Sequence, residues 1–202
     1  MKKILLLFLL IVSCLNIKAQ SIDGIGKIRL GMTVSELRDI FGEEIKTTKD
    51  FNGGITNTFM LSKYIPVEGY YINDFNLSFY NDSLYAMYSI EDTNIKDALS
   101  LKYGEPKMEQ KKETKEYTNG FGNTIEKIDQ SFEFTWDTGN DDIICYYRDR
   151  VVHNSNGKPN RYTVFGIENQ IVFNKIKMIK QEKNKTESEK QKQEKLKELD
   201  NL

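Results

Sequence analysis

The chain contains a single histidine, His153, and this scarcity excludes several kinds of catalytic centre. One imidazole cannot build a multi-histidine metal site, and any Ser-His-Asp or Cys-His arrangement would have to use His153 itself. No nucleophile motif accompanies it, and the residues that follow, Asn154 to Gly157, are typical of a turn. We therefore expect an exposed loop histidine and no catalytic, cofactor-binding or metal-binding residues.

Cysteine is scarce too, since the chain has only Cys14 and Cys145. Cys145 alternates with Ile143 and Tyr147, which predicts a buried strand residue rather than a reactive thiol. With one cysteine after residue 19, that part of the chain can form no internal disulfide, so packing must supply its stability.

A surplus of either charge is also lacking. The 29 Lys and Arg residues balance the 30 Asp and Glu residues, which gives a formal net charge of −1. Because nucleic-acid binding depends on a basic surface, we expect no nucleic-acid partner.

No apolar run is long enough to span a bilayer as a helix. The longest, Ile4 to Val12, falls short of the ~20 residues that a span needs. With Lys2 and Lys3 before it and Ala19 after it, this run predicts a secretory signal peptide over residues 1–19. We expect an extracytoplasmic protein, whether periplasmic, surface-attached or secreted, without a transmembrane span after signal removal.

A second processing site overlaps the signal peptide. The sequence Ile11-Val12-Ser13-Cys14 has the pattern of a bacterial lipobox, at which Cys14 would carry a lipid anchor. Cleavage after Ala19 would release the protein, whereas lipidation at Cys14 would tether it. The sequence leaves both outcomes open.

The remaining residues predict two similar segments, 20–91 and 92–170. In the first, Thr33 and Glu36 form a capping box at a helix start, and Gly42 is placed to end that helix. The seven residues from Leu37 to Glu43 align without gaps with the seven from Leu99 to Glu105. This correspondence favours an internal duplication.

The second segment repeats the plan of helix followed by strands. Its helix is expected to begin after Thr93 or Asn94 and to end at Gly104. Alternating apolar residues and turn signals predict six strands in the two segments, at 56–61, 70–80, 84–90, 124–136, 143–152 and 161–168. We expect an α+β fold with helices packed on one face of an antiparallel sheet. The charged tail, residues 171–202, is expected to be a polar helix or disordered.

Two groups of side chains are candidates for function. The acidic group is Asp137, Asp141 and Asp142, which follow a strand and are typical of a polar hairpin turn, with the site of a small secreted hydrolase as the alternative. The aromatic group is a set of strand tyrosines that would form an interaction surface unless they line the core, namely Tyr80, Tyr85, Tyr88 and Tyr146.

The stretch from Gly26 through Gly31-Met32-Thr33 to Phe41-Gly42 resembles the opening of the SmpA/OmlA (BamE-like) envelope proteins. Their motif ending, Gly-x-Pro, appears here in the second segment as Gly104-Glu105-Pro106. The repeated helix-and-strand plan also resembles the tandem architecture of β-lactamase-inhibitor-protein folds. The resemblance implies a non-enzymatic binding or assembly module that contacts another envelope protein, and it carries no catalytic residues. A small hydrolase that uses the acids near Asp137 is the alternative.

Overall fold

The computed structural model describes residues 21–48, 52–90, 94–118, 122–154 and 157–199. The expected signal peptide and the candidate lipidation residue Cys14 lie outside these ranges. Within them, no helix combines the length and the apolar character needed to cross a membrane.

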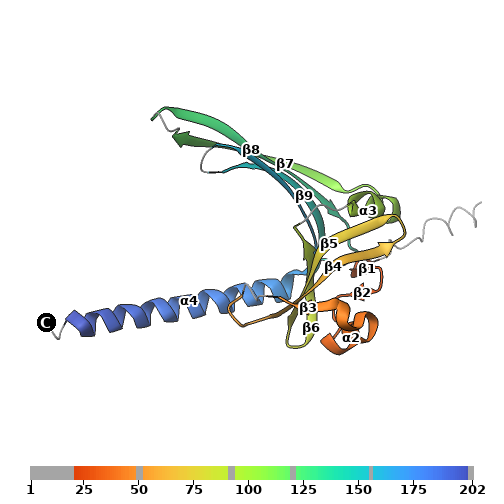
Figure 1. The fold of residues 1–202 in the computed structure, drawn as a ribbon, viewed down its shortest axis with the longest axis horizontal. Helices are drawn as coiled ribbons and strands as arrows, with labels where there is room; N and C mark the ends of the chain where they lie inside the picture. Colours follow the sequence, from red (N-terminus) through yellow and green to blue (C-terminus); the bar gives the residue numbers. More distant parts are fainter. Residues whose placement is uncertain (1–20, 49–51, 91–93, 119–121, 155–156, 200–202) are drawn as a thin grey trace, which may run out of the picture.

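A single eight-stranded antiparallel sheet organises the molecule, in the spatial order β3-β4-β5-β6-β10-β9-β8-β7 (Figure 1). Each half is a meander, and the last strands of the two halves, β6 and β10, pair at the centre. The bounds are β3 (Ile45–Thr47), β4 (Asn57–Val67), β5 (Tyr70–Tyr80), β6 (Ser83–Ser89), β7 (Lys107–Thr118), β8 (Thr124–Trp136), β9 (Ile143–His153) and β10 (Pro159–Asn169).

Short elements precede each meander. Before the first come a two-stranded ribbon, an α-helix and a 3-10 turn, and before the second comes one helix: β1 (Gly24–Ile25), β2 (Ile28–Arg29), α2 (Val34–Phe41), η1 (Gly42–Glu44) and α3 (Ile95–Tyr103). The capping box expected at Thr33 and Glu36 is confirmed, as are the helix ends at Gly42 and Gly104. Asn94 does not cap α3, because its side chain instead bonds backbone groups of the β4–β5 hairpin.

The expected α+β fold, with helices packed on one face of the sheet, is wrong. Strands dominate the described residues, and α2 and α3 have only 8 and 9 residues, so they do not form a layer. The sequence underestimated the sheet because strand prediction follows apolar alternation. β7 consists largely of Lys and Glu, and it was not predicted at all.

One hydrophobic core fills the face of the sheet that α2, α3 and the β1–β2 ribbon cover. Phe75 of the first half stacks on Phe165 of the second, with ring centroids 6.3 Å apart. Ile95 and Leu99 of α3 are buried in the same cluster. Because burying such a side chain contributes roughly 1.5–3 kcal/mol, the two halves stabilise each other.

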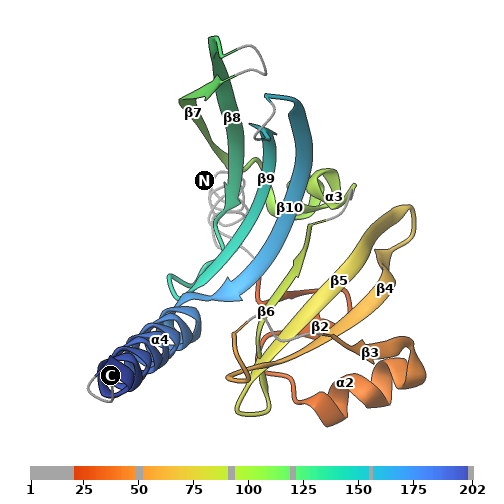
Figure 2. The ribbon, with the colours of Figure 1, turned by 60° about the vertical axis from the view of Figure 1, so that its left-hand side comes forward.

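A long helix, α4 (Gln170–Leu199), follows β10 directly and projects from the sheet (Figure 2). Its apolar contacts lie at its base, where Val172 and the buried Ile176 pack on Tyr85 and Ala86 of β6. Beyond this base almost every residue through Lys195 is exposed.

The sheet is curved, and its two faces differ. Figures 1 and 2 show α2 and α3 on the convex side, whereas the concave side formed by β8, β9 and β10 looks toward α4, and no helix of the described residues packs over it. The concave side therefore presents side chains of the sheet that no helix of the described chain covers.

Candidate functional site

We call the concave surface of β8, β9 and β10, together with its neighbour on β6, the open face. Strand register decides its members, because residues directly opposite in an antiparallel pair point to the same side. Gly166 stands opposite both Tyr88 and Tyr146, Arg148 stands opposite Glu133, and Arg150 stands opposite Tyr162. The open face is therefore defined by Tyr88, Glu133, Tyr146, Arg148, Arg150, Tyr162 and Gly166.

The Tyr146 ring lies across Gly166, which has no side chain to obstruct it. A Cβ at Gly166 would lie 2.5 Å from Cζ of Tyr146, closer than packed atoms approach each other. Tyr146 is 7% exposed, and burial raises the pKa of its hydroxyl. The glycine thus lets an aromatic ring lie flat against the centre of the sheet.

Arg148 covers the other side of the same ring. Its guanidinium carbon lies 4.0 Å from the Tyr146 centroid. Nε and Nη2 donate to the two carboxylate oxygens of Glu133 at 2.8 and 3.3 Å, and this pairing lowers the pKa of Glu133. A cation fixed over an aromatic ring is a preorganised contact surface.

A second arginine and aromatic pair continues this row. Arg150 lies 5.7 Å from the ring centroid of Tyr162 and is exposed to solvent. Among the described residues no carboxylate lies within ion-pair distance of Arg150, so its charge is available to a partner.

Only two of the four predicted tyrosines lie on the open face. Tyr88 is half-buried there and Tyr146 is nearly covered by Arg148. Tyr85 is buried beneath the base of α4, and Tyr80 is half-buried near the ammonium of Lys175. Sequence reasoning missed Arg148 and Glu133, which are 15 residues apart and meet only through the β8–β9 register.

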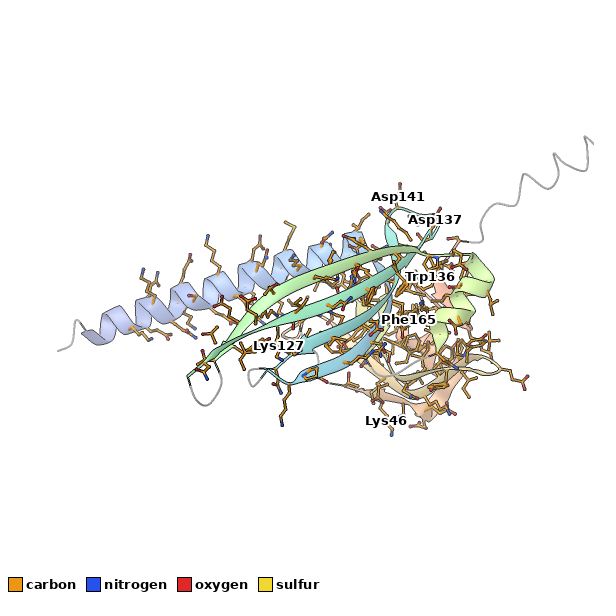
Figure 3. The ribbon with its side chains drawn as sticks, turned by 90° about the horizontal axis from the view of Figure 1, so that it is seen from above. Lys46, Lys127, Trp136, Asp137, Asp141 and Phe165 are labelled. Atoms are coloured by element: carbon orange, nitrogen blue, oxygen red, sulfur yellow. The ribbon has the colours of Figure 1, made fainter. Side chains whose placement is uncertain are left out.

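The acidic group forms part of the β8–β9 turn. Figure 3 shows Asp137 and Asp141 at the outer rim of the sheet, away from the core residues Trp136 and Phe165. The Asp137 carboxylate accepts the backbone N–H of Gly139 at 2.8 Å. This contact of Asp137 is typical of a polar turn. Across the described residues no group of three or more His, Cys, Asp or Glu side chains is placed to hold a metal ion.

His153 is less exposed than expected. Its side chain is 13% exposed, and Nδ1 lies 3.0 Å from Asp129, which also accepts the His153 backbone N–H at 2.8 Å. Lys115 donates to the same carboxyl at 2.6 Å and is the main cause of its low pKa, about 2. No Ser, Thr or Cys side chain of the described chain bonds the imidazole, so this cluster ties strands together without a nucleophile.

An apolar groove of about 340 Å³ lies on the convex side, between α3 and the β4–β5 hairpin. Its walls include Pro66, Val67, Leu99 and Leu101, and Leu101 is 81% exposed. Lys102 is the one charged residue in this lining. No carboxyl group lies in this lining.

No protein-family model, no curated protein and no solved structure matches the chain. The surfaces described above are therefore interpreted from their geometry alone.

Proposed function

We propose that the chain is an exported, non-enzymatic module that binds or helps to assemble another protein of the bacterial cell envelope through its open face. The observation that carries this proposal is the stack of Arg148 on Tyr146, held by Glu133 in the middle of a concave surface over which the described part of the chain places no helix. Tyrosine and arginine are the residues that most often dominate protein interfaces.

Preorganisation supports a protein partner. Arg148 is fixed by two hydrogen bonds to Glu133 before any partner arrives, so binding would cost less side-chain entropy. Arg150, exposed and without a carboxylate partner in the described chain, adds a charge that an acidic residue of the partner can meet.

The envelope location rests on the N-terminal sequence and on the resemblance to the SmpA/OmlA proteins. Intact-mass measurement of the protein purified from the producing cells tests it. Export with release gives a chain that begins at Gln20, and anchoring gives a lipid-modified chain that begins at Cys14. Recovery of a full-length, unmodified chain from the cytoplasm alone would contradict export.

Site-specific photo-crosslinking in intact cells tests the binding surface. A photoreactive amino acid replaces Arg150 or Tyr162 on the open face, and Asp39, exposed on α2, serves as the control position. We expect a discrete crosslinked product from the open face that Arg148→Glu abolishes. Equal products from all three positions, or a product insensitive to Arg148→Glu, would refute the proposed surface.

A further inference from the structure

The strand β7 is a long, exposed edge of the sheet. All of its 12 residues pair with β8 without a bulge, and most of its side chains are exposed. In the described part of the chain no strand lies on its outer side, as Figures 1 and 2 also show. Such an edge presents unpaired N–H and C=O groups to which another strand can add.

The charges of β7 do not suit the strand beside it. Like charges directly opposite each other destabilise a strand pair. The β7–β8 register places four such pairs, which are Glu109 with Glu133, Glu113 with Asp129, Lys115 with Lys127 and Glu116 with Glu126.

The ion pairs that β7 does make join residues that are not directly opposite each other. Lys115 reaches diagonally to Asp129 at 2.6 Å and along its own strand to Glu113 at 3.6 Å. Lys111 lies 3.7 Å from Glu109 on the same strand. The alternation of Lys and Glu along β7 is therefore not explained by its pairing with β8.

The same alternation suits a second copy of β7. We propose that two copies of this chain pair through β7 in an antiparallel register centred on Thr114, so that two open faces lie on the same side of one continuous sheet. The opposed residues are then Thr114 with itself, Glu113 with Lys115, Lys112 with Glu116, Lys111 with Tyr117, and Gln110 with Thr118. No like charges meet, and four opposite-charge pairs form per dimer.

Neighbouring registers are excluded by charge. A residue on the two-fold axis faces its own copy, so an axis at Lys112, Glu113, Lys115 or Glu116 brings like charges together. An axis at Gln110 also avoids like charges, but it pairs only the seven residues from Lys107 to Glu113. The register at Thr114 pairs nine.

This inference is independent of the proposed function, since the edge and the open face are different surfaces. If both hold, the dimer presents two binding faces, which raises the apparent affinity for a partner with two sites. The competing explanation is that charge on β7 keeps the edge free of partners. The experiments below distinguish the two.

Cysteine substitution tests the register. Exposed Thr114 is replaced by Cys in a Cys14→Ser background, where buried Cys145 is the only other thiol. Opposed residues lie about 4.5–5.5 Å apart between Cα atoms, which suits a disulfide. We expect Thr114→Cys to form a disulfide-linked dimer under mild oxidation. The control Gln110→Cys should not, because its two copies would lie roughly 27 Å apart.

Exchanging the charges of Lys112 and Glu116 tests whether the partner of β7 is a second copy of β7. Lys112 and Glu116 make no ion pair within the described chain, so changing them breaks no ion pair of the monomer there. Lys112→Glu and Glu116→Lys should each weaken the dimer about tenfold in Kd by sedimentation equilibrium. A mixture of the two variants should form the heterodimer at parental strength, and so should the double variant with itself. Lys190→Glu, exposed on α4, is the control and should change nothing.

Crosslinking and charge exchange together decide whether the chain dimerises through β7. The proposal is supported if the chain dimerises, if Thr114→Cys forms the disulfide-linked dimer, and if mixing the two charge variants restores the dimer. A chain that is monomeric at all concentrations, crosslinking through Gln110→Cys or Lys112→Cys instead, or a dimer indifferent to charge exchange would each overturn it.

Discussion

Gly166 sets the shape of the open face because any side chain there would meet the ring of Tyr146. Its backbone does not have a positive φ, so alanine is compatible with the local conformation and the contact alone limits the position. The arrangement of Tyr146 and Arg148 thus depends on the absence of one methyl group.

We predict that Gly166→Ala destabilises the protein by about 1–3 kcal/mol, because the added Cβ forces Tyr146 out of its place. Chemical denaturation measures the loss. In a Tyr146→Leu background the same substitution should cost much less, since the shorter side chain relieves the contact. An equal cost in both backgrounds would show that Gly166 matters for another reason.

The carboxyl of Asp129 should make stability depend on acid. Its pKa is lowered from 3.8 to about 2, chiefly by the hydrogen bond from Lys115. A lowered folded-state pKa stabilises the protein above the unfolded-state value, and this contribution is lost as the pH falls from about 4 to about 2. Asp129→Asn should therefore be less stable than the parent at pH 6, and the gap should shrink across that window.

Denaturant titrations from pH 6 to pH 2 provide this measurement. Asp141→Asn, which removes an exposed carboxyl from the β8–β9 turn, is the matched control and should behave like the parent. A gap between Asp129→Asn and the parent that stays constant with pH would be inconsistent with the ion pair.

The structural role of a residue could be predicted from the sequence only where the signal lies within a few consecutive residues. The capping box of Thr33 and Glu36 needs four consecutive residues, and the structure contains it. The Arg148–Glu133 pair needs the register of β8 and β9, and a slip by one residue would place the two side chains on opposite faces of the sheet. For that reason the sequence could suggest the tyrosines as part of an interaction surface, but it could not indicate that Arg148 and Glu133 lie beside them.

At the scale of elements, prediction followed apolar patterning. β5 and β8 have the expected bounds, because apolar residues mark both strands. β7 was missed since only pairing with β8 makes its charged sequence a strand. β4 runs to Val67, six residues beyond its expected end, past Pro66.

The helix α4 illustrates an element held at one end. Polar residues surround most of it, so tertiary packing of Val172 and Ile176 is what fixes its direction. Lys183 adds one contact farther along, where its ammonium donates to the backbone carbonyl of Gly53 at 2.8 Å.

We predict that Ile176→Ala costs about 2 kcal/mol, at the low end for a buried isoleucine, because the cluster beneath α4 is small. The loss should be local. Hydrogen exchange should quicken in the base of α4 while the strands of the sheet stay protected. Met178→Ala, which alters a side chain that is 61% exposed, is the control. Equal deprotection of the whole sheet would mean that the base of α4 is part of the global core.

For the whole molecule, the antiparallel pairing of β6 with β10 makes one sheet out of two similar halves. The core crosses this boundary, since Phe75 packs on Phe165 and the α3 residue Leu99 is buried among side chains of both halves. The repeated plan of the sequence therefore describes the chain order and not two independent folding units.

This shared core gives the last prediction. A chain divided between residues 91 and 92 should yield two fragments that do not unfold cooperatively alone, because each exposes half of the core and one central strand edge. Mixed at equal concentration, they should restore the sheet. Trp136, the only tryptophan, is 3% exposed in the intact chain, so its emission should shift to shorter wavelength on mixing. Phe165→Asp in the second fragment should prevent this recovery, and Lys190→Glu should not. A cooperative transition in either fragment alone, at the midpoint of the intact chain, would instead show that each half folds on its own.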